Sequence, residues 1–195
     1  MGIFSGREGG GLRAPHRIRV HGRKLSDILA AHAAFVRGGE GGARAELAGA
    51  DLSRADLGKA NLSYADFQEA NLEGANLREA KLTSADLSRA NLRTADLRKA
   101  DLTEAHLDGA DLTAARVGGA ELFRATMQRA VLRRTDCVAA NFREADISGA
   151  VFEGAILRTA VLRETKLDGV DLSHAEGLDA AVMPRGYASQ PAPKS

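Results

Sequence analysis

The stretch ADLSRADLGKANLSYADFQEANLEGANL, residues 50–77, repeats a five-residue pattern. The pattern continues in both directions and forms 26 consecutive units between Ala45 and Ala175. The centre of every unit is apolar, and the residue two places before it is Ala in nearly every unit. The sequence therefore predicts one column of large apolar side chains and one of small ones. The first column includes Leu52, Leu57, Leu62, Phe67, Leu72, Leu77, Leu82, Leu87, Leu92, Leu97 and Leu102.

Neither a straight helix nor a flat strand can bury both columns. On an α-helix, a five-residue step rotates the centre by about 140°, which spreads the apolar side chains around the whole circumference. On a straight strand, an odd period sends successive centres to opposite faces, so half of them would meet water. The chain keeps every centre inside only if it turns once in each unit. We therefore predict a coil with both columns facing inward.

The A-(D/N)-L-x-x signature resembles the pentapeptide-repeat family, and the match covers residues 45–175. This resemblance implies an all-β solenoid, a right-handed quadrilateral β-helix with four repeats in each coil. With that number the 26 units form about six and a half coils, and a layer spacing of about 4.8 Å gives a rod of roughly 30 Å.

The ends of such a rod need covers, because they expose unpaired backbone. Within residues 25–44, Leu25 and Ile28 begin a series of apolar residues at helical spacing. This series predicts an N-terminal capping α-helix and a linker, with Ser26 as the N-cap and Gly38 as the stop.

The remaining flanks are expected to be less ordered. Residues 1–44 carry eight Lys/Arg against three Asp/Glu, and we expect residues 1–24 to be a mobile basic segment in which residues 18–20 could add a short strand. The repeat loses its register at Gly177, so residues 176–195 are predicted to form a short C-terminal cap and a mobile tail.

Composition narrows the class of protein. The chain has 195 residues, enough for one domain, and an aromatic content of 4%, so its core must use small aliphatic side chains. Cys137 is the single cysteine, which excludes an internal disulfide and favours a reducing compartment. No stretch has the roughly 20 apolar residues that cross a bilayer, and the N-terminus lacks a hydrophobic signal core. We therefore expect a cytoplasmic location and no membrane partner.

The residues that could carry chemistry are scattered. The five histidines share no motif, and no glycine-rich phosphate loop is present. We interpret His32 as a packed core histidine and Cys137 as an inert residue of the inward column. The Asp and Asn residues before each centre recur too regularly for a catalytic pair, and we expect them to bond the turn backbone. We predict no catalytic residue, metal site or cofactor, and no enzymatic activity.

Two outward features are candidate interaction surfaces when every fourth repeat is taken as one ladder. The first, here called the acidic ladder, carries Glu46, Asp66, Glu69, Asp86 and Asp108. The second, here called the apolar positions, consists of Val131 and Val151, which replace the usual Asp or Asn on adjacent coils, followed by Ile156 and Val161. The apolar positions could form an interface with a second copy or another protein, or the C-terminal segment could fold back over them.

Two functional classes follow from these surfaces. We expect a non-enzymatic scaffold that binds an unknown protein partner, with a homodimer through the C-terminal half as one form. The family resemblance implies an alternative, imitation of duplex DNA by which relatives bind DNA gyrase, but that role needs dense negative charge and this rod mixes both signs. The basic N-terminal segment has no interleaved aromatic residues, so we expect a solvated flank and no direct nucleic-acid binding.

Overall fold

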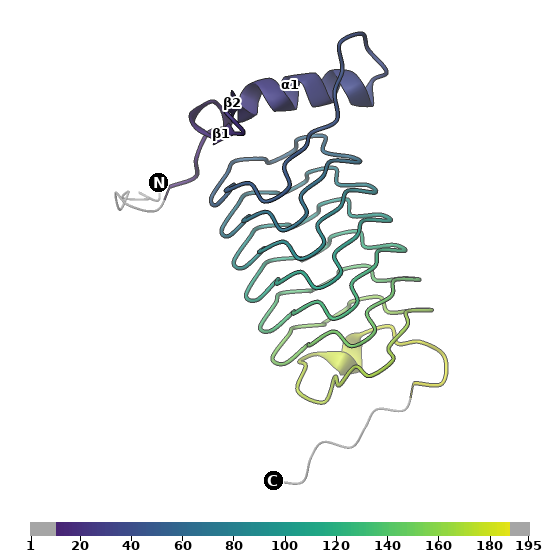
Figure 1. Cartoon of the computed structure of the whole chain (residues 1–195). Helices are drawn as coiled ribbons and strands as arrows, with labels where there is room; N and C mark the ends of the chain where they lie inside the picture. Colours follow the sequence, from purple (N-terminus) through teal and green to yellow (C-terminus); the bar gives the residue numbers. More distant parts are fainter. Residues whose placement is uncertain (1–10, 188–195) are drawn as a thin grey trace, which may run out of the picture.

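The structure is a computed structural model that describes residues 11–187. From Glu46 onward the chain winds into stacked coils, which Figure 1 shows from the side. Parallel bridges join residues that are 20 apart, such as Asp51 with Asn71 and Asn71 with Asn91. Twenty residues are four repeats, so each coil contains four units and each outer face is a ladder of every fourth unit.

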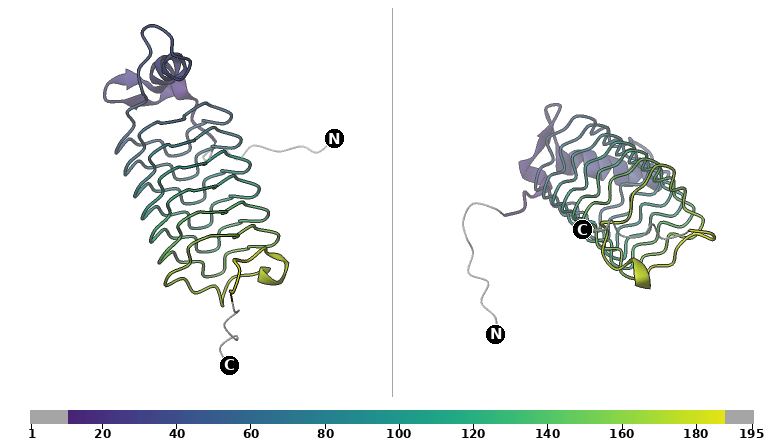
Figure 2. Two further views of the ribbon diagram at one scale, coloured as in Figure 1. Left: turned by 90° about the vertical axis from the view of Figure 1, so that its right-hand side faces the viewer. Right: turned by 90° about the horizontal axis from the view of Figure 1, so that it is seen from below.

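Both inward columns lie in the interior of the coils. Every centre from Leu47 through Leu162 is at most 1% exposed, and the alanines between them are almost as well buried. Burying one such leucine is worth on the order of 1.5–3 kcal/mol, and the alanines leave room for the coil to close without voids. Successive coils follow the same path one above the other (Figure 2), and the bridges between residues 20 apart set each centre next to the one four repeats later.

Each corner of the coil is a tight turn. The amide of each Ala donates to the carbonyl of the preceding centre, as Ala75 does to Leu72 at 3.0 Å. The last residue before the Ala takes a left-handed conformation, with φ near +60° at Lys59, Glu104 and Ala139 among many others. Between coils, the amide of each centre donates to the carbonyl 19 residues later, as Leu97 does to Arg116 at 2.7 Å.

The N-terminal end is more ordered than the sequence predicted. Residues 1–10 lie outside the described residues, but the segment expected to be mobile is folded from residue 11 on. A 3₁₀ turn, η1 (Pro15–Arg17), leads into strands β1 (Arg19–Val20) and β2 (Arg23–Lys24), which form an antiparallel hairpin.

Two apolar residues at alternate positions explain this order, one just before β1 and one within it. Ile18 and Val20 are buried against the core, which anchors the short strands. The backbone at Arg13 also bridges Ala55 of the first coil.

Helix α1 (Leu25–Val36) lies across the N-terminal end of the coils (Figure 1). Its N-cap is Lys24 and not Ser26, because the hairpin fixes the start of the helix: the Leu25 amide donates to the Ile18 carbonyl at 2.9 Å. The Ser26 hydroxyl bonds to Asp27 instead. The helix ends as predicted, with Gly38 at φ +67° just beyond it.

At the C-terminal end the coil gains one extra residue. Ile156 bridges Glu176, which is 20 residues later, but Val161 bridges Val182, which is 21 later. Gly177 absorbs the change with φ +77°, and a Cβ there would come within 2.9 Å of the Arg158 backbone. The 3₁₀ turn η2 (Leu178–Ala180) follows, and Met183 and Tyr187 pack against the core. Residues 188–195 of the expected mobile tail lie outside the described residues.

His32 connects α1 to the first repeat. Its side chain is fully buried, and its Nδ1 accepts a hydrogen bond from the Ala45 amide at 3.0 Å. A nitrogen that accepts must be unprotonated, so the docked helix requires a neutral imidazole. Burial lowers the pKa of His32, the backbone of Ser63 raises it in part, and the nearby Arg44 lowers it further.

We predict that α1 undocks as the pH falls. Because the folded pKa of His32 lies below the unfolded value of about 6.5, its contribution to stability is present above pH 6.5 and is lost below it, by up to about 1.4 kcal/mol per pH unit. Urea unfolding at pH 7.5 and pH 5 should show this loss. His32→Gln keeps an acceptor that does not titrate and should reduce the loss. An equal pH dependence of the two proteins would contradict the prediction.

Candidate interaction surfaces

The polar residues before each centre stabilise the turns. The Asp51 carboxylate accepts a hydrogen bond from the Ser53 amide at 3.1 Å, and Asp111 does the same for Thr113 at 2.9 Å. Asn side chains form the same contact, for example Asn76 with the Arg78 amide. These carboxylates and amides therefore have a structural role, as their regular recurrence indicated.

An arginine partly neutralises the acidic ladder at the N-terminal end of the rod. Bridges stack Glu46 on Asp66 and Asp66 on Asp86. Arg44 contacts Glu46 and Asp66. Its Nε lies 2.8 Å from the Glu46 Oε1 and its Nη2 lies 3.5 Å from the Asp66 Oδ2. The hydrogen bond from Arg44 holds the pKa of Glu46 below its usual value.

The other acids of the ladder are also engaged. Glu69 pairs with Arg89 at 3.0 Å, and Asp108 accepts from the Thr126 hydroxyl and the Gln128 amide, both at 2.7 Å. Burial would raise the pKa of Asp86, but hydrogen bonds from Ser88 and Gln68 keep it lowered. The five residues therefore lie on one face but do not present a row of free negative charge.

The apolar positions occupy three faces in succession. Val131 and Val151 bridge each other on one face, whereas Ile156 and Val161 lie on the next two faces of the same coil. All four side chains are partly exposed. The C-terminal segment extends the ladders edge to edge, through the bridge of Val161 with Val182, and leaves Val131 and Val151 accessible.

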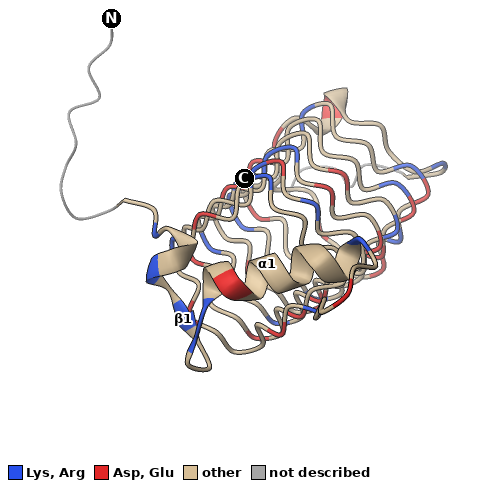
Figure 3. Ribbon diagram, turned by 90° about the horizontal axis from the view of Figure 1, so that it is seen from above, with Lys and Arg blue, Asp and Glu red and all other residues tan. Residues whose placement is uncertain are grey.

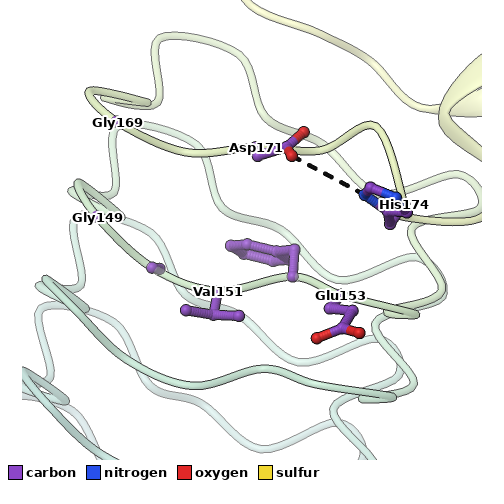
Figure 4. A pocket seen from close by; sticks show the side chains of 8 residues that line it. Gly149, Val151, Glu153, Gly169, Asp171 and His174 are labelled. Atoms are coloured by element: carbon purple, nitrogen blue, oxygen red, sulfur yellow. Dashed lines mark ion pairs between the residues drawn. The ribbon is translucent and has the colours of Figure 1, made fainter. Parts of the chain in front are cut away.

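A depression of about 360 Å³ opens beside Val151, where the last coil separates from the one before (Figure 4). Its lining includes Glu153, Asp171 and His174, with 3.9 Å between His174 Nδ1 and the Asp171 carboxylate. Val151 has no bridge partner on its Asp171 side within the described residues, which explains the gap. The depression therefore adjoins the valine pair on the side of Val151.

One outward aromatic was missed by the sequence analysis. Phe123 lies between two arginines, with the Arg124 and Arg143 guanidinium carbons 4.7 and 5.6 Å from its ring centre. Arg124 also pairs with Glu144 at 2.8 Å. The available signal was that Phe123 is the only aromatic directly after a centre, with an arginine 20 residues later.

The residues that could have suggested catalysis lie apart. Cys137 is fully buried, and burial raises the pKa of its thiol far above the usual value. Within residues 11–187, no three His, Cys, Asp or Glu side chains are grouped so that they could hold a metal ion. No helix in the same part of the chain is long and apolar enough to span a membrane.

Comparisons with known proteins agree on one family. The model of pentapeptide repeats matches residues 43–78, 75–113 and 120–158, in eight copies. No curated protein matches the sequence.

Three solved structures illustrate the similarity. HetL, a pentapeptide repeat protein involved in heterocyst differentiation regulation from the cyanobacterium Nostoc, is 30% identical over 73% of this chain and 78% of its own, with a TM-score of 0.45. A pentapeptide repeat protein of the Arabidopsis thaliana thylakoid lumen is 32% identical over 54% and 66%, with a TM-score of 0.27. Full-length QnrB1, a plasmid-mediated fluoroquinolone resistance protein, is 20% identical over 68% and 81%, with a TM-score of 0.24.

The corner contacts predict a measurable acid sensitivity at Asp146. The pKa of Asp146 is lowered to about 2. The causes are hydrogen bonds from the Ser148 hydroxyl and amide, a hydrogen bond from Gln128, and the positive charge of Lys166, although burial of Asp146 opposes the shift. Its folded pKa lies below the unfolded value, so the contribution is present above about pH 4 and is lost as the pH falls to 2. Asp146→Asn should therefore be less stable than the wild type at pH 6, by about 1–2 kcal/mol, and equally stable near pH 2.

Urea unfolding across this pH range measures the difference. Ser148→Ala keeps the carboxylate but removes the hydroxyl hydrogen bond that lowers the pKa of Asp146 most. The stability of this variant should therefore fall less between pH 6 and pH 2 than that of the wild type. A constant gap between wild type and Asp146→Asn from pH 6 to pH 2 would show that the carboxylate does not act in this way.

Proposed function

Because the chain belongs to the pentapeptide repeat family, whose fold is a right-handed β-helix, we propose that it is a non-enzymatic scaffold that presents its outer faces to another protein. The N-terminal helix α1 acts in this proposal as a cap that prevents end-to-end addition of further coils. The rod between the two ends then offers its ladders as binding surfaces.

The observation that carries the proposal is the pair Val131 and Val151. At the same position on the same ladder, Asp51 and Asp111 accept hydrogen bonds from the turn amides. Valine cannot make this bond, and neither valine is buried within this chain. The two residues therefore give up a stabilising contact and leave apolar surface in water, which is favourable only when a partner covers it.

The partner of this surface is a second copy of the chain or another protein with an apolar patch. The adjoining depression beside Val151 adds concave area, and Ile156 carries apolar surface to the next face. A homodimer through the C-terminal half is the form that can be tested with the purified chain alone.

We predict that Val131→Asn with Val151→Asn abolishes this association and preserves the fold. Asparagine suits the position, because Asn71 and Asn91 stack there on the same ladder with their side chains 3.0 Å apart. Sedimentation velocity at about 100 µM should show a dimer for the wild type and a monomer for the double variant.

The matched control is Lys81→Asn with Glu121→Asn, which changes the same repeat position on another ladder. This control should keep the dimer. A monomeric wild type would contradict the homodimer, and a dimeric Val131→Asn/Val151→Asn protein would contradict the role of the valines.

Modulation of DNA gyrase by imitation of DNA is less well supported by the charges. Arg44 and Arg89 face three of the five acids of the acidic ladder, so the surface lacks the uniform negative charge of a phosphate backbone. We predict that the purified protein leaves gyrase supercoiling of a relaxed plasmid unchanged at micromolar concentration. Inhibition in that assay would restore the DNA-mimic function.

A further inference from the structure

A group of exposed basic side chains projects from the N-terminal end of the rod. It consists of Arg17, Arg19, Arg23 and Lys24, together with His16 and His21, and is called here the basic hairpin. Residues 11–24 contain no Asp or Glu. Figure 3 shows this basic segment around β1, beside α1, where Asp27 is the acidic residue on the helix.

Among the residues that the structure describes, the cations of the basic hairpin have no carboxylate partner. Arg13, just before it, pairs with Asp51 at 3.1 Å. Within residues 11–187, no Asp or Glu oxygen lies within 4.0 Å of Arg17, Arg19, Arg23 or Lys24. Arg19 instead donates to the Gly22 carbonyl of its own turn, at 2.8 Å. On the rod, in contrast, five arginines reach a carboxylate one coil away: Arg89, Arg93, Arg124, Arg133 and Arg143.

The hairpin register sets like charges against each other. Arg19 lies directly opposite Lys24 in the antiparallel pair. Like charges in this position destabilise a hairpin, and these strands have only two residues each to offset the repulsion. An anion bound between the two side chains would turn the repulsion into attraction.

Helix α1 adds positive potential at the same place. It begins directly after Lys24, and no side chain caps its first amides. Uncapped amides and the helix dipole attract anions, above all when basic side chains surround them. The planar guanidinium groups of Arg19 and Arg23 suit phosphate oxygens.

We propose that the basic hairpin binds the phosphate backbone of duplex nucleic acid, without sequence preference. Within residues 16–24 the two apolar side chains, Ile18 and Val20, are buried in the core, so the hairpin itself lacks the apolar centre that protein interfaces use; the exposed Leu12 lies before it. The turn at His21 and Gly22 has no apolar side chain to insert into a membrane.

This binding revises the expectation of a solvated flank. That expectation rested on the absence of aromatic residues, which stack on the bases of single strands. Contacts with a duplex backbone need only positioned cations, and the structure gathers four of them on a folded support.

Fluorescence anisotropy with a labelled random-sequence duplex tests the proposal. About three phosphate contacts predict a slope of log K against log salt near −2.7, which is roughly a 40-fold loss of affinity between 50 and 200 mM NaCl. Arg19→Gln, Arg23→Gln and Lys24→Gln together should lower the affinity at 50 mM at least tenfold and bring the slope close to zero. The melting temperature should not fall, because the substitutions remove the Arg19–Lys24 repulsion.

The matched control removes three unpaired cations elsewhere. Lys99→Gln, Arg129→Gln and Arg163→Gln lie on the rod, are exposed, and change the net charge by the same amount. Their affinity should stay within about twofold of the wild type. An equal loss in both triple variants, or no binding at 50 mM, overturns the proposal.

Two further ligands test whether the basic hairpin prefers another polyanion to duplex nucleic acid. Tighter binding of vesicles containing phosphatidylserine, or of polyglutamate, than of the duplex would assign the surface to a membrane or an acidic protein and would also overturn the proposal. The hairpin variant keeps Val131 and Val151, so its sedimentation tests the scaffold function independently.

Discussion

The turn that closes each five-residue unit is the constraint on which the rest of the structure depends. It lets a large apolar side chain and a small one enter the same narrow interior from every side of the coil. Thr135 and Thr165 show how strict the interior is, because each replaces a buried alanine. Their hydroxyls donate to the carbonyls of Leu112 and Phe142, both at 2.8 Å, so neither hydroxyl is left unpaired.

The same turns determine what the outer faces can do. Asp and Asn before the centres accept hydrogen bonds from turn amides, and many remaining acids pair with arginines one coil away, as Glu153 does with Arg133. Many outward polar groups are therefore already engaged within the rod. Val131 and Val151 stand out because they lack the turn hydrogen bond that Asp or Asn makes at their position, and Phe123 because it is the only aromatic residue directly after a centre.

The sequence predicted the interior far better than the ends and the faces. An invariant column of centres leaves only one way to bury them, and the late arrival of Leu178 marked the inserted residue at the C-terminal end. The second strand, β2, and its pairing with β1 could not be foreseen, because strands of two residues carry no period. Ser26 was misassigned as the N-cap because the contact that starts α1 joins Leu25 to Ile18, outside the helix itself.

The free charge of the acidic ladder could not be read from the sequence alone. Its residues were placed on one face correctly by counting repeats, but the ion pairs that neutralise them depend on side-chain geometry between coils. Arg44, which precedes the first repeat, reaches two members of the ladder. A count of charges on a face therefore overstates its field, whereas no carboxylate of residues 11–187 lies within 4.0 Å of the four cations of the basic hairpin. The amide of each centre bonds the next coil along the rod, so the distance between the basic hairpin and the valine pair cannot change without breaking these bonds. Whatever binds at either surface is held at a fixed spacing from the other.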